Sequence, residues 1–280
     1  HLAGCGEHGD PFAEEAMIIE FVGTPGAGKT TLMNAAVESL NERGYHAYSA
    51  NDAARPVAAR TLPGRAIVHV FSPRRQRPLL WQLFYAATEA ERVRFYWRHR
   101  DLMHRVWAYQ RRRPISAADR HHVLRWFNHQ TGVYEFMRRR VGPAEAVLFD
   151  EGFIHRAVQL FASEYEVPLP EAVGAYVALL PRPDLLIYVA APLEVCRDRV
   201  LARGIWERFA VKSATDTDRF LAAAEQAVTR AVAAARERQW PVIELDNATD
   251  DPSPAIGQLQ KALADFAPVP AHRHSLLRET

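Results

Sequence analysis

The chain has 280 residues, of which 48% are hydrophobic and 24% charged, a composition that is typical of a folded globular protein and not of a disordered one. No apolar run approaches the roughly 18 residues that span a bilayer, and two cysteines are too few for a disulfide framework. We therefore expect a cytoplasmic protein that makes no membrane contact. The net charge of +2 is unevenly spread, because residues 71–140 hold 16 arginines and 5 acidic residues. Either an anionic partner or a solvated helical surface would explain that segment.

Short apolar segments alternate with longer helical patterns along the chain. Strands are predicted at Met17–Val22, Tyr45–Ser49, Ala146–Phe149, Leu185–Ala190 and Pro241–Leu245. Helices are predicted at Thr30–Arg43, Pro192–Arg203, Asp218–Gln239 and Pro254–Phe266, and residues 79–140 are expected to be mostly helical with breaks at Pro114 and Gly132. This alternation predicts an α/β fold, in which helices cover both faces of a parallel sheet.

A glycine-rich segment joins the first predicted strand to the first predicted helix. It matches G-x-x-x-x-G-K-[ST] with Gly23, Thr24, Pro25, Gly26, Ala27, Gly28, Lys29 and Thr30. The backbone N–H groups of such a loop, together with the positive end of the following helix, bind phosphate. Lys29 would reach the β- and γ-phosphates, and the Thr30 hydroxyl would bind Mg²⁺. The motif therefore predicts a nucleotide-binding loop, which Thr31 extends into the first helical turn.

Two carboxylates follow the third predicted strand, at Asp150 and Glu151. In a parallel sheet this strand end lies near the phosphate loop, where ligands bind. Asp150 would then hold Mg²⁺. Glu151 would either polarise water, as in ATPases, or orient an acceptor hydroxyl, as in kinases. The alternative is an exposed pair at the start of the next helix.

An arginine-rich segment follows the fourth predicted strand. Arg199 and Arg203 are four residues apart, so they share one helix face, and Gly204 follows them. Two guanidinium groups on one face suit the charge of a transferred phosphoryl group, and Gly204 would let the segment hinge as a lid. In a chain so rich in arginine, the alternative is that both are ordinary surface residues.

The order of these motifs resembles the thymidylate kinase and deoxynucleoside kinase group of P-loop kinases. The resemblance covers about residues 16–50 and 145–266. Beyond the phosphate loop it rests on Asp184-Leu-Leu-Ile-Tyr-Val, Pro192-Leu-Glu-Val, Arg199-x-x-x-Arg203-Gly204, Val242-Ile-Glu-Leu-Asp246 and Asn247-Ala248-Thr249. It implies a three-layer P-loop NTPase fold, with ATP as the donor, Mg²⁺ as the metal, lid arginines on the phosphates and Asn247 on the adenine side.

The sequence departs from that group at two places. The third strand ends in Asp150-Glu151-Gly152, where the group usually has an acidic residue followed by arginine. The stretch between the second and third strands is also longer than expected. We predict a flexible segment at 1–15, a kinase domain at 16–266 and a tail at 267–280. The domain would include a helical insert at about 71–142 and a lid at about 197–212.

Asp52, just after the second strand, is where the related kinases place a carboxylate on the acceptor side. It would act as a general base, or it would only cap the helix that follows. The predicted activity is transfer of the γ-phosphate of ATP to a hydroxyl or phosphate group of a small metabolite, such as a nucleoside or nucleotide. An ATP-hydrolysing switch and a nucleic-acid 5′-end kinase that uses the basic insert are the alternatives, although no nucleic-acid-binding motif accompanies the insert. The sequence is compatible with a homodimer.

Overall fold

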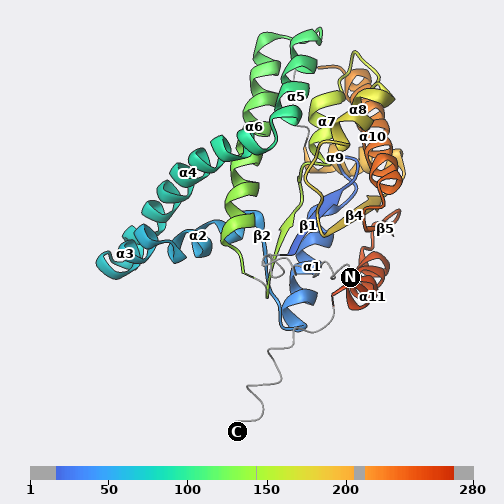
Figure 1. The fold of residues 1–280 in the computed structure, drawn as a ribbon. Coiled ribbons are helices and arrows are strands. Elements are labelled where there is room, and N and C mark those ends of the chain that lie inside the picture. The colour runs from blue at the N-terminus through green and yellow to red at the C-terminus, as the bar shows by residue number, and fades with distance from the viewer. Residues whose placement is uncertain (1–16, 143, 205–211, 268–280) are drawn as a thin grey trace, which may run out of the picture.

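The computed structural model describes residues 17–142, 144–204 and 212–267 (Figure 1). Five strands of this described part form a parallel sheet in the order β2-β3-β1-β4-β5. They are β1 (Met17–Val22), β2 (His46–Ser49), β3 (Glu145–Phe149), β4 (Leu185–Ala190) and β5 (Val242–Asp246). The carboxyl ends of β1 and β3 are neighbours, which brings residues 23 and 150 to one edge of the sheet. The predicted segment 1–15, residues 205–211 of the predicted lid and residues 268–280 of the predicted tail lie outside the described residues.

Helices connect the strands. In chain order they are α1 (Lys29–Glu42), α2 (Ala50–Arg60), α3 (Leu62–Val70), α4 (Pro73–Arg98), α5 (Arg100–Arg112), α6 (Ala117–Arg140), α7 (Arg156–Phe161), α8 (Pro170–Val177), α9 (Leu193–Arg203), α10 (Ala214–Glu237) and α11 (Ser253–Phe266). None of these described helices combines the length and the apolar character that crossing a membrane requires.

The sheet is covered by helices on both faces, which confirms the predicted three-layer α/β fold (Figure 1). Helices α1 and α11 pack on one face, and α6, α7, α8 and α10 pack on the other. In β1, Ile19 and Phe21 belong to the hydrophobic core beneath α1 and α11, whereas Ile18 and Val22 belong to the core on the opposite face. Strands covered on both sides are apolar on both sides. Glu20 interrupts this pattern and is buried at 1% exposure.

The predicted strands are confirmed with small shifts of their ends, but the helical region differs from the prediction. Helices begin at Ala50 and not near residue 71, because α2 and α3 fill the stretch after β2. The predicted break at Pro114 is confirmed between α5 and α6. The predicted break at Gly132 is wrong, since α6 continues through it.

Gly132 lies where α6 crosses α4, and this contact explains its presence within a helix. A Cβ atom at this position would lie 2.3 Å from the backbone oxygen of Thr88 in α4. The missing side chain therefore allows the two helices to touch through their backbones. Glycine costs helix propensity, and here the close packing of α4 on α6 offsets that cost.

Replacing Gly132 with alanine is expected to lower the free energy of unfolding by about 1–3 kcal/mol, because the added methyl group forces α4 and α6 apart. Gly257 in α11 is the matched control, since a Cβ atom there would meet nothing within 4 Å. Gly257→Ala should raise stability by about 0.5–1 kcal/mol through helix propensity alone. Urea unfolding of the two variants measures both effects, and a Gly132→Ala protein as stable as the wild type would contradict the close crossing.

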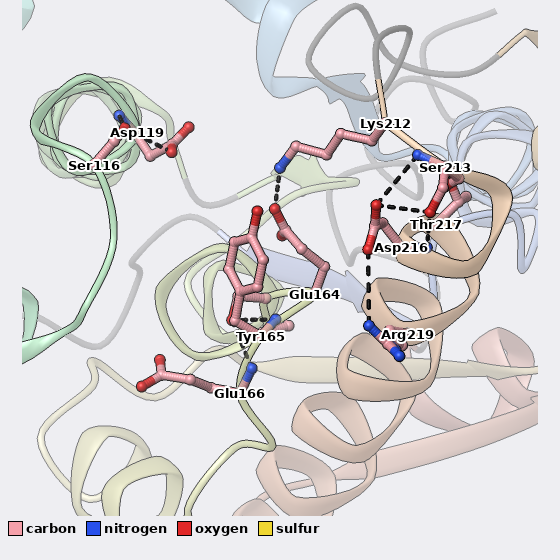
Figure 2. A network of polar contacts seen from close by, with 12 residues as sticks. Ser116, Asp119, Glu164, Tyr165, Glu166, Lys212, Ser213, Asp216, Thr217 and Arg219 are labelled. Atoms are coloured by element: carbon pink, nitrogen blue, oxygen red, sulfur yellow. Dashed lines mark hydrogen bonds and ion pairs between the residues drawn. The ribbon is translucent and has the colours of Figure 1, made fainter.

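Helix α10 begins at Ala214, earlier than the predicted Asp218, because a capping box starts it. The Ser213 hydroxyl accepts a hydrogen bond from Asp216 N at 3.1 Å, and Ser213 N donates to the Asp216 carboxylate at 3.2 Å (Figure 2). Figure 2 also shows that Lys212, which precedes this cap, forms an ion pair with the buried Glu164. The start of α10 is thereby tied to the loop that follows α7.

The arginines of the insert serve two different purposes. Glu91 in α4 and Glu135 in α6 are buried, and each is surrounded by arginines. These ion pairs join Arg94, Arg139 and Arg140 to Glu91, and Arg98 and Arg138 to Glu135. Other arginines lie on an arm, formed by α3 and the start of α4, that projects from the body (Figure 1). The segment's charge therefore combines internal packing with a basic exposed surface.

Candidate functional site

The glycine-rich segment forms a tight loop between β1 and α1. Gly26 has φ of +91°, a conformation that favours glycine, and a Cβ atom there would lie 2.2 Å from the backbone oxygen of Cys196 in α9. On the other side, the Asn247 amide donates a hydrogen bond to the backbone oxygen of Ala27 at 2.7 Å. The loop is thus held between α9 and the segment after β5.

The other residues of the predicted motif differ in exposure. Thr24 and Pro25 are buried, and the Thr24 backbone oxygen accepts a hydrogen bond from Ala27 N at 2.9 Å. Thr30 and Thr31, in the first turn of α1, are exposed. The loop is therefore closed on its inner side and open at the N-terminus of α1, where a phosphate would bind.

Lys29 bends back over the loop that precedes it. Its Nζ donates to the backbone oxygens of Gly23 at 3.0 Å and Thr24 at 3.4 Å. Burial lowers the pKa of Lys29 to about 8, against the opposing effect of the nearby Glu151 and Asp150 carboxylates. The ammonium group is thus poorly hydrated and faces negative charge, which suits it to bind a phosphate oxygen.

The structure brings the first predicted carboxylate to the phosphate loop. The Thr30 hydroxyl donates a hydrogen bond to Asp150 Oδ2 at 3.2 Å, although the two residues are 120 positions apart. The parallel pairing of β1 with β3 causes this contact, because it places both strand ends side by side. A hydroxyl and a carboxylate at this distance are a donor set that suits Mg²⁺, which prefers oxygen ligands and keeps several waters.

Glu151 pairs with Arg156 at 3.0 Å. Arg156 is 5% exposed, and a second guanidinium nitrogen lies 3.5 Å from the Gln130 oxygen in α6. Three buried nitrogens in this cluster have no partner among the described residues: Arg156 Nε, Gln130 Nε2 and His155 Nδ1. Buried polar atoms without partners are costly, and the N–H groups of Arg156 and Gln130 would donate hydrogen bonds to oxygen atoms of a ligand. His155 also hydrogen-bonds the Gly23 backbone, which ties the cluster to the phosphate loop.

Glu20 lies beneath this cluster. Its Oε2 accepts a hydrogen bond from Ile154 N at 3.1 Å, while its Oε1 is buried with no hydrogen-bond partner within residues 17–142, 144–204 and 212–267. Burial raises the pKa of Glu20 to about 7, against the lowering effects of the Ile154 and Phe153 backbone and of Arg156. Arg156 and the hydroxyls of Tyr134 and Tyr176 are the ionisable groups whose fields interact with it.

Stability should fall as the pH rises through the range in which Glu20 ionises. The pKa of Glu20 is higher in the folded state than in the unfolded chain. The stability that the protonated Glu20 contributes is therefore fully present below about pH 4.5 and is lost as the pH approaches 7. Glu20→Gln should remove this loss, so between these pH values the variant gains up to roughly 3 kcal/mol of unfolding free energy relative to the wild type. Urea unfolding across pH measures it, with the exposed Glu38→Gln as control. Parallel profiles for Glu20→Gln and wild type would contradict the prediction.

The two predicted lid arginines have different surroundings. Arg199 donates to the backbone oxygens of Asn247, at 3.1 Å, and Thr249, and it lies 3.7 Å from the Asp250 carboxylate. Arg203 is exposed at the end of α9, near enough to Lys29 for its charge to lower the pKa of that lysine. Arg203 thus lies close enough to the phosphate loop to act on Lys29 electrostatically, whereas Arg199 joins α9 to the segment after β5.

Asp52 lies in the first turn of α2. Its backbone N–H donates to the Ser49 hydroxyl at 3.0 Å, and that hydroxyl donates to the Asp52 carboxylate at 2.7 Å. Ser49 is therefore the N-cap residue, and Asp52 stabilises the first turn of the helix. Asp52 is exposed, and its other carboxylate oxygen makes no hydrogen bond or ion pair with the described residues.

Sequence reasoning missed Glu20, Gln130, His155 and Arg156. One signal was available, because a glutamate in the middle of an apolar strand is rarely buried without a purpose. Gln130 lies in α6, Arg156 in α7 and His155 in the turn before α7, none of them in a motif, and only the packing of α6 and α7 brings them to the phosphate loop.

No protein-family model and no curated protein matches this sequence. Among solved structures, the chain is similar to deoxyadenosine kinase from M. mycoides with bound dCTP. The identity is 11% and the TM-score is 0.37, over 89% of this chain and 100% of that one.

Proposed function

We propose that this protein transfers the γ-phosphate of ATP to a hydroxyl or phosphate group of a small metabolite. The main support for this proposal is the carboxylate pair after β3, because Asp150 and Glu151 contact different groups. Asp150 meets Thr30 of the phosphate loop at 3.2 Å, and Glu151 meets the buried Arg156 at 3.0 Å. A metal-binding side and an acceptor side therefore adjoin at one strand end.

Each predicted residue receives a role in this proposal. The backbone of residues 23–31 and Asn247 would hold the nucleotide, and Thr30 with Asp150 would hold Mg²⁺, which neutralises charge on the phosphates. Lys29 and Arg203 would bind the transferred phosphoryl group, and Arg199 would position the segment after β5 beside the nucleotide. Glu151 and Asp52 are the two candidates for the acceptor proton.

The cluster around Arg156 favours a kinase over a simple ATPase. Hydrolysis requires only a positioned water, whereas buried nitrogens without partners fit the oxygen atoms of a bound acceptor. The cationic character of Arg156 suits an acceptor that carries negative charge or hydroxyl groups. Nucleosides, nucleoside monophosphates and sugars share these features.

The proposal is tested by ADP release from Mg-ATP, measured alone and with pools of nucleosides, nucleoside monophosphates, sugars and aminoglycoside-like alcohols. Mass spectrometry identifies any acceptor that has gained a phosphate. A pool that raises ADP release and gains a phosphate supports the kinase and narrows its acceptor. If ATP is hydrolysed at the same rate with and without every pool, the result would favour the ATP-hydrolysing switch.

The basic arm keeps the nucleic-acid 5′-end kinase as a second candidate. Residues 62–88 contain four arginines and no acidic residue, and Leu62 and Val70 on this arm are 83% and 73% exposed. Oligonucleotide binding through these arginines should weaken steeply with salt. Absent or salt-independent binding would remove this candidate.

A further inference from the structure

A cavity lies between α5, the end of α7 and α8. It has a volume of about 890 Å³, which is within the range of small-molecule sites. Its floor is apolar and includes Val106, Leu160, Phe161 and Tyr176. An apolar floor of this size offers a favourable environment for the body of a small organic molecule.

The rim of this cavity is positively charged. Arg100, His104, Arg105 and Arg112 line it from α5, against a single acidic lining residue, Asp101. Arg100, His104 and Arg112 follow the four-residue spacing of one helix face, with Ala108 between them, and Arg105 is next to His104 in sequence. The three arginine side chains are exposed, and a bound anion would neutralise part of their charge.

Gln110 supplies an independent sign of a ligand. This lining residue is fully buried, and its Nε2 donates to the Leu160 backbone oxygen at 2.8 Å. Its Oε1 is buried and has no hydrogen-bond partner in the described part of the chain. A buried amide oxygen left unpaired is costly, and an N–H or O–H group of a ligand in the cavity would satisfy it.

The cavity is separate from the phosphate site. Its lining includes no residue of the phosphate loop and neither carboxylate after β3. The ring of Tyr176 forms part of the wall between them, and its hydroxyl donates to the Phe153 backbone oxygen at 2.8 Å. A ligand could therefore occupy the cavity whether or not the phosphate site is filled.

We propose that this cavity binds an amphipathic organic anion, with an apolar body against α7 and α8, an anionic group at the α5 arginines and a hydrogen-bond donor facing Gln110. The inference does not depend on the proposed kinase activity. The three features of the ligand match three features of the cavity, namely the apolar floor, the cationic rim and the unpaired amide oxygen.

The test uses 8-anilinonaphthalene-1-sulfonate, which combines aromatic rings, a sulfonate and an N–H group. Its uncharged analogue, N-phenyl-1-naphthylamine, lacks only the sulfonate. We expect the folded wild-type protein to bind one sulfonate probe saturably, with a rise in fluorescence. The double variant Arg105→Ala/Arg112→Ala should bind the sulfonate about tenfold more weakly, which corresponds to the loss of two exposed charge contacts, and the uncharged probe equally well.

Two single variants complete the experiment. Ala108→Trp, at an exposed lining position, should fill the cavity and weaken both probes at least about tenfold. Arg111→Ala, on the same helix but outside the lining, should change neither. Circular dichroism verifies that each variant is folded. No saturable binding to the wild type, or equal sulfonate affinity in the double variant and Arg111→Ala, would overturn the proposal.

Discussion

Replacing Lys29 with alanine is expected to lower the rate of phosphoryl transfer by about 10³-fold, the size of effect seen when one preorganised charge-stabilising group is lost. In the structure this ammonium group lies on the loop carbonyls, close to Asp150 and Glu151. No other lysine is in the phosphate loop, so no neighbouring ammonium can replace it. The acceptor-dependent ADP release assay measures the loss.

The same variant should remain folded, because burial of Lys29 disfavours its charged form. With its pKa lowered to about 8, the folded state binds this proton less tightly than the unfolded chain does. Removing the ammonium group should therefore leave the melting temperature unchanged or raise it. Lys261→Ala, at an exposed position in α11, is the matched control and should keep full activity. Turnover retained by Lys29→Ala would refute the assignment of this loop.

Replacing Glu151 with glutamine should lower kcat by about 10²-fold or more, if Glu151 accepts the proton of the acceptor. Its carboxylate affects Lys29 electrostatically and contacts the buried Arg156, so it lies between the phosphate loop and the polar cluster around Arg156. Glutamine preserves the shape and removes the charge. The loss should appear in kcat more than in KM, because binding of the nucleotide does not use this group.

Asp52→Asn is the matched variant for this comparison. Because Asp52 interacts with the Ser49 hydroxyl at the start of α2, the substitution should cost about 0.5–1 kcal/mol of stability and change kcat by less than about threefold. Steady-state kinetics and thermal unfolding of both variants separate the two carboxylates. A large loss of kcat in Asp52→Asn with normal kcat in Glu151→Gln would reverse the assignment and make Asp52 the base.

Local patterns in the sequence were sufficient for much of the fold and for one half of the site. The strands could be predicted because each is a short apolar run followed by turn residues, and the loop from Gly23 to Thr30 has a spacing that its backbone chemistry requires. The position of Asp150 followed as well, because parallel strands end at one edge of a sheet. Its hydrogen bond with Thr30 agrees with that reasoning.

Only the tertiary structure decided the polar cluster around Arg156 and the packing of the helices. A glycine such as Gly132 looks the same in the sequence whether it ends a helix or lies where two helices cross. The close approach of the Thr88 backbone shows that it lies at a crossing. Arg156 is one of 32 arginines in the sequence, and nothing local distinguishes it from the exposed ones. Its burial beside Glu151 arises because α7 packs under α6. Periodicity and motifs reflect interactions between residues that are close in sequence. The polar cluster and the cavity beside α5 instead depend on helices that are distant in sequence and pack together in the fold.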